Sequence, residues 1–179
     1  MEIQNIPNDW IIKSPVKEKI SKSERIKKDD YFLKIAMVVA ERSTCMRHHV
    51  GAVAVKEGHI IATGYNGSLS GFPHCLELNC VRNQLKIPSG TRTEICRAIH
   101  AEQNVIIQCA LHGKSIEGAA IYCTHTPCVL CAKMLANSKI KRFVTYVDYP
   151  DPSFLQIFKQ AGIEFVKLDK PDREINELQ

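Results

Sequence analysis

The chain has 179 residues, of which 45% are hydrophobic and 24% are charged, and its formal net charge is +5. This length allows one domain with one core, and it is too short to expect two. The modest positive charge does not favour a nucleic-acid-binding surface, and no apolar run approaches the roughly 18 residues that cross a bilayer. The N-terminal segment lacks the features of a secretion signal, so we expect a cytoplasmic protein without a membrane partner.

The chain divides into an arm, a domain and a tail. Residues 1–28 form a predicted arm that is rich in lysine and holds two prolines. The domain is predicted at residues 29–168, and a polar tail follows at residues 169–179.

The first half of the domain contains one helix and one hairpin. Asp29 and Asp30 are residue types that cap helices, and residues 31–43 follow them with helical apolar spacing. Residues 50–56 and 59–65 read as two strands of a β-hairpin because a Glu-Gly turn joins them.

Residues 65–97 form a long connection rich in glycine, proline, cysteine and polar residues. A structureless loop of this length is unusual in a compact domain, so a function or a metal staple is expected there.

The second half of the domain alternates between helices and strands. The predicted helices cover residues 98–111, 127–138 with Thr126 as the cap, and 151–162, and the predicted strands cover residues 118–124, 142–147 and 163–168. This order predicts an α/β fold in which helices cover a mostly parallel sheet with a hairpin at its start.

Four residues form the strongest chemical signal: His100, Glu102, Cys128 and Cys131. The two cysteines are three residues apart near a predicted helix start, so both sulfurs face the same side. His100 lies near the start of another predicted helix. Helices that follow parallel strands begin at the same edge of a sheet, which is where ligands of open α/β sheets collect. The four side chains are therefore expected to meet.

One histidine and two cysteines supply three ligands for zinc. A structural zinc site usually has four protein ligands, whereas a catalytic site leaves the fourth position to water. Glu102 lies two residues from His100, where its carboxylate can exchange a proton with that water. The alternative is a purely structural zinc clip, which has no need of this carboxylate.

The pattern His-x-Glu…Pro-Cys-x-x-Cys is the signature of zinc-dependent nucleobase deaminases. From about Asp30 to Val166 the chain resembles a narrower family, the deoxycytidylate (dCMP) deaminases. The matching segments are RSTC-M-R (42–47), VGAV (50–53), TGYNGS (63–68), HC…C (74–80), CRAIHAEQN (96–104), THTPC-x-x-CAKM (124–134) and AGI (161–163).

This resemblance implies an α/β fold of the cytidine deaminase type, a three-layer α-β-α sandwich with a mixed five-stranded sheet. It implies hydrolytic deamination of dCMP to dUMP with release of ammonia, which supplies dUMP for thymidylate synthesis. It also implies a homohexamer that dCTP activates and dTTP inhibits. No nucleic-acid partner is expected.

The resemblance also assigns roles at the metal. His100, Cys128 and Cys131 hold the catalytic Zn²⁺, whose bound hydroxide attacks C4 of the cytosine ring. Glu102 takes the proton of the water, delivers one to N3, and helps the amino group leave.

Three further residues are candidates for binding the nucleotide. By the resemblance, Asn66 holds the deoxyribose, whereas an ordinary Asn-Gly turn is the alternative. Arg42 and Arg47 are candidates for the 5′-phosphate because a guanidinium matches phosphate geometry, and simple surface charge is the alternative.

A second group of cysteines lies in or beside the connection at residues 65–97. Some dCMP deaminases carry a second, structural zinc in these regions. The resemblance therefore implies that Cys45, Cys75, Cys80 and Cys96 are four ligands, with His74 as a substitute. Such a metal would order a loop that has no core of its own. Free thiols are the alternative, and Cys109 and Cys123 read as small buried residues.

Two other functions stay open on the sequence. One is another deaminase on the same scaffold, acting on tRNA adenosine, guanine, cytidine or dCTP. The other is a non-catalytic, zinc-stabilised accessory protein of DNA uptake. The long insertion at residues 65–97 favours dCMP over the first, and Glu102 weighs against the second.

Overall fold

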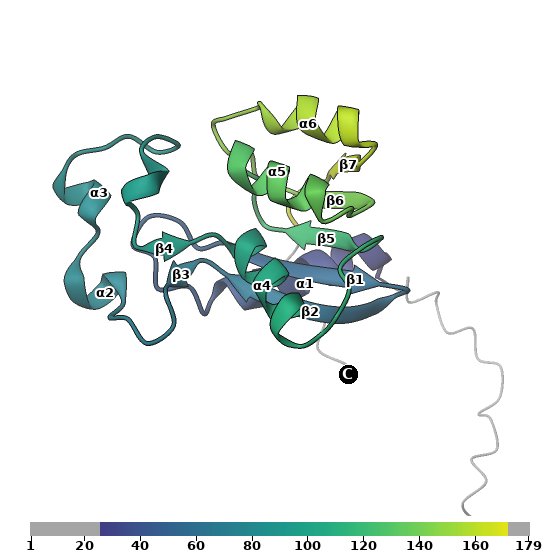
Figure 1. Cartoon of the computed structure of the whole chain (residues 1–179), viewed down its shortest axis with the longest axis horizontal. Coiled ribbons are helices and arrows are strands. Elements are labelled where there is room, and N and C mark those ends of the chain that lie inside the picture. Colours follow the sequence, from purple (N-terminus) through teal and green to yellow (C-terminus); the bar gives the residue numbers. More distant parts are fainter. Residues whose placement is uncertain (1–25, 172–179) are drawn as a thin grey trace, which may run out of the picture.

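A computed structural model describes residues 26–171, in which a five-stranded sheet lies between two layers of helices (Figure 1). Most of the predicted N-terminal arm (residues 1–25) and most of the polar tail (residues 172–179) lie outside the described residues. Among the described residues, no helix combines the length and the apolar character that a membrane span requires.

The sheet is mixed, in the order β2-β1-β5-β6-β7. Its strands are β1 (Gly51–Lys56), β2 (His59–Tyr65), β5 (Ala120–Cys123), β6 (Arg142–Thr145) and β7 (Glu164–Lys167). β1 runs antiparallel to both of its neighbours, whereas β5, β6 and β7 are parallel. Four strands, β2, β5, β6 and β7, therefore run in one direction and β1 alone opposes them. The predicted mostly parallel sheet with a hairpin at its start is confirmed, and so is the mixed five-stranded sheet that the resemblance implies.

Helices cover both faces of this sheet. The helix α1 (Lys28–Ala40) packs on one face, where its residues Phe32, Leu33 and Ala36 share a buried cluster with Val53 and other strand residues. The other face carries α4 (Ala101–Leu111), α5 (Val129–Asn137) and α6 (Phe154–Ala161), and it holds the larger core cluster. The three-layer α-β-α sandwich is therefore confirmed.

Alternation along β1 divides its side chains between the two cores. Ala52 and Ala54 belong to the cluster beneath α4, whereas Val53 and Val55 belong to the cluster beneath α1.

The helix α4 approaches the hairpin closely at Gly64 of β2, where an added Cβ would lie 2.5 Å from the carbonyl oxygen of Ala101. This close approach holds the N-terminal turn of α4 against β2.

The start of α1 differs from the prediction. The N-cap is Lys27, so Asp29 and Asp30 lie inside the first turn, where acidic side chains interact favourably with the helix dipole. Asp29 accepts hydrogen bonds from Arg142 at 2.6 and 3.0 Å and from the hydroxyl of Tyr122 at 2.8 Å. Asp29 therefore joins α1 to β5 and β6 rather than capping the helix.

The connection at residues 65–97, which we call the excursion, lies beside the sheet body (Figure 1). It is not structureless, because it contains β3 (Gly67–Ser68), α2 (Cys75–Leu78), α3 (Val81–Gln84) and a 3₁₀ turn, η1 (Thr93–Ile95). β3 pairs with β4 (Ala98–Ile99), which occupies residues that we predicted as the start of a helix. This pairing closes the base of the excursion and shifts the start of α4 to Ala101.

Candidate metal centre

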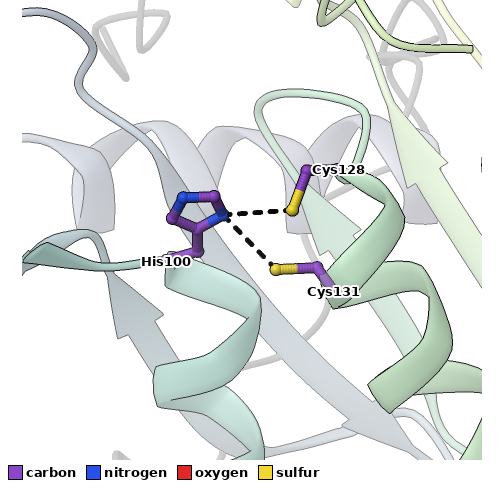
Figure 2. A group of neighbouring side chains, drawn as sticks. All are labelled: His100, Cys128 and Cys131. Carbon is purple, nitrogen blue, oxygen red and sulfur yellow. Dashed lines mark hydrogen bonds between the residues drawn. The ribbon is translucent and has the colours of Figure 1, made fainter. Parts of the chain in front are cut away.

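The starts of two helices bring three metal-binding side chains together. The Nδ1 atom of His100 lies 3.5 Å from the Sγ atom of Cys128 and 3.4 Å from that of Cys131. Figure 2 shows the imidazole ring facing both sulfurs across the space between α4 and α5. The ligand atoms of all three residues lie within 4.8 Å of one another. The structure therefore gathers the three predicted zinc ligands at one point.

The helix α4 begins three residues later than predicted, and α5 begins two residues later. His100 is the N-cap of α4, and its backbone N–H donates to the Oε1 atom of Gln103 at 2.7 Å. Cys128 is the N-cap of α5, so Thr126 is not the cap. The hydroxyl of Thr126 instead accepts a hydrogen bond from the backbone N–H of Tyr149 at 2.6 Å. His100 and Cys128 thus lie at the boundary between extended chain and helix.

The pKa values of the two thiols shift in opposite directions. Hydrogen bonds from Cys131 and then from His100 lower the pKa of Cys128 to about 4, although burial opposes this. The hydrogen bond to Cys128 and burial together raise the pKa of Cys131. A thiolate next to a buried second thiol and an imidazole is the donor set that Zn²⁺ prefers. The residues present therefore fit a zinc ion.

Glu102 lies in the first turn of α4 and is only 4% exposed. Burial raises the pKa of its carboxyl, and the charge of nearby His100 acts against that rise. Glu102 lines the same pocket as His100 and Cys128, and none of the ion pairs between described residues involves it. This carboxyl can hold or release a proton beside the metal site.

The pocket around this centre includes two of the three predicted nucleotide-binding residues. Asn66 and Arg47 line it, whereas Arg42 is exposed and is not part of the lining. The Oδ1 atom of Asn66 accepts from the backbone N–H of Val50 at 2.9 Å and from the hydroxyl of Ser43 at 2.6 Å. Its Nδ2 atom donates one hydrogen to a backbone oxygen at 2.8 Å, so a second hydrogen is left.

Two pocket residues were missed by the sequence interpretation. Arg82 and Tyr149 both line the pocket, and Arg82 is 7% exposed. Arg82 is one charged residue within a polar stretch, and its burial follows from the folding of the excursion rather than from local pattern. Tyr149 follows β6 at the edge where the metal centre lies, and that position was the available signal.

The second cysteine group converges less tightly. All four cysteines of this group, Cys45, Cys75, Cys80 and Cys96, line the pocket. Burial raises the pKa of Cys75, and smaller contributions come from the other three. Among the described residues, only the His100 group has its ligand atoms within 4.8 Å of one another. His74 contacts the hydroxyl of Thr44 at 3.3 Å, and it does not line the pocket.

Cys109 and Cys123 are 2% and 0% exposed, and both belong to the core on the α4 face. The prediction that they are small buried residues is therefore confirmed.

Comparison with known proteins places this centre in a wider context. Residues 26–147 match the family model for the cytidine and deoxycytidylate deaminase zinc-binding region. The ComE operon protein 2 of Bacillus subtilis (strain 168) is 39% identical over 150 residues, which cover 82% of this chain and 75% of that protein. The deoxycytidylate deaminase of Schizosaccharomyces pombe is 31% identical over 178 residues, which cover 95% of this chain but 55% of that enzyme. This chain therefore matches about half the length of the yeast enzyme.

A solved structure gives the same picture for the fold. The dCMP deaminase from the cyanophage S-TIM5, crystallised in complex with dCMP and dUMP, superposes with a TM-score of 0.68 at 32% identity. The match covers 80% of this chain and 100% of the cyanophage chain. The segment that matches the family model includes His100, Glu102, Cys128 and Cys131.

Proposed function

This chain belongs to the cytidine and deoxycytidylate deaminase family, and on that premise we propose that it hydrolyses dCMP to dUMP and ammonia. The observation that carries the proposal is the buried carboxyl of Glu102 in one pocket with His100 and Cys128. A purely structural metal site would not require a buried carboxyl beside its ligands, since burying such a group is costly.

The metal belongs at the three residues whose ligand atoms converge. His100, Cys128 and Cys131 would hold one Zn²⁺, and three protein ligands are the number typical of a catalytic zinc site. When bound, the ion supplies a hydroxide nucleophile at neutral pH by lowering the pKa of water to about 7.

Glu102 moves the protons of the reaction. Its carboxylate accepts the proton that water loses and delivers it to N3 of the cytosine ring. The carboxylate then accepts the proton of the new C4 hydroxyl and delivers it to the amino group, so that the C4 carbonyl forms and the C4–N bond breaks. In sum, dCMP and water become dUMP and ammonia. Because Glu102 is almost fully buried, bulk solvent does not compete for this proton.

The nucleotide would be oriented by residues at the rim of the pocket. The free hydrogen of Asn66 Nδ2 is a donor for the deoxyribose, since the other polar contacts of that amide hold it in place. Arg47 is the better of the two predicted phosphate ligands because it lines the pocket, whereas Arg42 does not.

A second zinc is also part of the proposal. Cys45, Cys75, Cys80 and Cys96 would bind it, with His74 as a substitute. Support comes from the position of the four cysteines at one pocket, although they lie in separate segments of the chain. A shift of the thiols towards a common centre would complete the site, and the binding free energy would add to the stability of the excursion.

The family resemblance alone supports the remaining parts of the proposal. They are assembly as a homohexamer, activation by dCTP and inhibition by dTTP, and supply of dUMP for thymidylate synthesis.

A substrate panel tests the function. The purified protein would be incubated separately with dCMP, CMP, deoxycytidine, dCTP and guanine, and chromatography would follow each deaminated product. We expect turnover of dCMP, with dCTP added as an activator in a parallel sample. Turnover of another compound in preference to dCMP would overturn the substrate assignment, and no turnover with zinc bound would favour a tRNA substrate or a non-catalytic role.

A further inference from the structure

The pocket at the metal centre has little free space. Its cavity volume is about 70 Å³, whereas pockets that bury a drug-sized ligand typically offer about 300–1,000 Å³. A nucleotide therefore fits only after part of the wall moves. On the body side the wall stands on α4 and α5, which the larger core cluster fixes. Neither core cluster of the described chain includes a residue of the excursion, so the excursion side is the part that can move.

One short turn of the excursion clamps residues that line this pocket. We call it the strap, and it consists of residues 87–91 between α3 and η1. Nη1 of Arg47 donates to the carbonyl oxygen of Ile87 at 2.9 Å, and Nε2 of His48 lies 2.9 Å from the hydroxyl oxygen of Ser89. Arg47 and His48 both line the pocket, whereas the strap itself does not. The strap therefore holds part of the wall from outside.

Arg82 is a third lining residue that binds the strap. Its Nη2 donates to the carbonyl oxygens of Pro88 at 3.0 Å and Thr91 at 2.7 Å. The side chain of Arg82 is buried, and its Nε–H has no hydrogen-bond partner among the described residues. An unpaired buried donor is unfavourable, so the arrangement in which the strap is closed leaves this guanidinium incompletely satisfied.

The strap also contacts the loop that follows β6. A Cβ added at Gly90 would lie 3.6 Å from the Cβ of Pro150 and 4.0 Å from the hydroxyl oxygen of Tyr149. Tyr149 lines the pocket as well. The strap thus joins the excursion to the body at two places, the segment before β1 and the loop after β6, and it does so through few contacts. Segments with few buried apolar contacts open at low cost in free energy.

The strap is flanked by residues with strained backbone. Lys86 precedes it with a φ of 52°, and Arg92 follows it with a φ of 50°. This left-handed region is unfavourable for residues other than glycine, and such strain collects at ligand clamps and switch regions. Lys86 lies just beyond α3, and Arg92 is the N-cap of η1. Hinges are usually a few residues at the ends of elements, so both residues are placed to act as hinges.

We propose that the strap swings open about Lys86 and Arg92 to admit the nucleotide and closes again over the occupied pocket. Opening would release the four lining side chains that the strap contacts, and so widen the cavity. Closure would restore those contacts and keep bulk water away from Glu102 during proton transfer. The inference rests on the proposed function, which supplies the nucleotide that enters.

A disulfide that locks the strap shut tests this motion. Gly90→Cys combined with Pro150→Cys would place two Cβ atoms 3.6 Å apart, within the range of about 3.5–4.5 Å that disulfides adopt. Peptide mass spectrometry would verify the bond, and wild type and both single variants, treated with the same oxidised glutathione, are the controls. We expect the oxidised, zinc-loaded double variant to lose at least about 10-fold in dCMP turnover, and dithiothreitol to restore it. Turnover that the verified bond leaves unchanged would contradict the proposal.

Trypsin cleavage of the free, zinc-loaded protein tests the strap without a nucleotide. Trypsin cuts after lysine and arginine in extended chain, so the cuts after Lys86 and Arg92 should occur only when the strap is open. We expect the disulfide to slow both cuts at least about 10-fold and to leave the cut after the exposed Lys114 unchanged. Equal rates in the oxidised and reduced protein would overturn the proposal. If the bond slows the cuts but neither wild type nor the reduced variant converts dCMP, the deaminase function fails and the strap stands.

Pro150→Ala covers the case in which the two cysteines do not pair. The change removes the Cγ atom that faces Gly90 at 3.8 Å from the added Cβ, so the strap should open more often. We expect the cuts after Lys86 and Arg92 to become about 2- to 5-fold faster. Pro152→Ala, at an exposed position of the same loop, is the matched control. Cleavage that Pro150→Ala leaves unchanged would show that this contact does not hold the strap, and the proposal would be wrong.

Discussion

The sheet body and the excursion bury opposite kinds of residue. In the body the largest fully buried side chains are apolar, such as Phe143, Phe158 and Leu33. In the excursion the buried side chains are Asn66, Cys75, Cys80 and Arg82, whereas five of its large apolar residues are exposed, namely Leu69, Phe72, Leu76, Leu78 and Leu85. A hydrophobic core therefore stabilises the body, while hydrogen bonds, and in our proposal a metal and the substrate, stabilise the excursion.

This contrast separates two tasks. The core fixes α4 and α5 on the sheet, and these helices carry His100, Glu102 and the two cysteines that would perform the reaction. The excursion supplies Asn66, Arg82 and three of the four cysteines of the second group, all of which line the pocket, and in our proposal Asn66 would contact the nucleotide. Precise chemistry benefits from the rigid part of a scaffold, whereas recognition tolerates a segment that ligands order.

The largest effects are expected when one cysteine is removed from each region. Cys128→Ser should lower the zinc content from about two ions per chain to about one, and nearly abolish deamination, because the catalytic metal loses a ligand. Cys80→Ser should also remove about one zinc, but it should mainly make the excursion sensitive to proteolysis. Metal analysis measures the zinc content of both variants, and limited proteolysis measures how readily their excursion is cleaved. A zinc content near one in the wild type would contradict the second site.

A pair of phenylalanines tests the contrast in packing. Phe143→Ala in the body should lower the free energy of unfolding by about 3–5 kcal/mol, because the ring is completely buried. Phe72→Ala in the excursion should change it by no more than about 0.5 kcal/mol, since that residue is 62% exposed. Urea titrations of the two variants give both values. Equal destabilisation would mean that the excursion has a hydrophobic core of its own in solution.

The smallest expected effect concerns pH. Hydrogen bonds from Arg142 lower the pKa of Asp29 in the folded state, against the opposing effect of burial. A lowered carboxyl pKa stabilises the fold above the unfolded pKa, about 3.9, and this contribution is lost as the pH falls through the folded value. Asp29→Asn should therefore cost about 1 kcal/mol at pH 7, and the difference from the wild type should shrink towards pH 3.

The excursion offers the control for this measurement. Glu94 pairs with Arg92, and both side chains are exposed, so Glu94→Gln should leave the unfolding midpoint unchanged at either pH. Urea titrations at the two pH values compare each variant with the wild type, which cancels the common effect of zinc loss in acid. A difference for Asp29→Asn that grows as the pH falls would contradict the assigned sign.

Regular structure was predictable from the sequence wherever the apolar period was sustained. The hairpin of β1 and β2, and the later alternation of helices and strands, follow directly from that pattern. Helix starts were less predictable. Threonine is a residue type that caps helices, but the hydroxyl of Thr126 instead accepts a hydrogen bond from the backbone N–H of Tyr149. The choice between these partners depends on a contact 23 residues away, which local sequence does not contain.

The metal centre was predictable because its residue types and spacing are specific, whereas the rest of the pocket was not. Spacing indicated that His100, Cys128 and Cys131 would meet, and they do. Arg42 and Arg47 lie in one motif, yet Arg47 reaches the pocket and Arg42 does not. Arg82 was missed because the excursion is folded by long-range pairings such as β3 with β4, so neither its path nor its buried charge follows from local propensity.

We propose that Glu102, which the sheet body positions in the pocket, moves the protons of the reaction. The most direct test of this proposal is the rate of dCMP deamination by Glu102→Gln, measured with zinc content and melting temperature, and with Glu94→Gln as the control. We expect unchanged zinc content and folding, and a rate lower by about 10²- to 10⁴-fold, as for loss of a general acid–base group. A variant that holds zinc and deaminates dCMP at the wild-type rate would contradict the account.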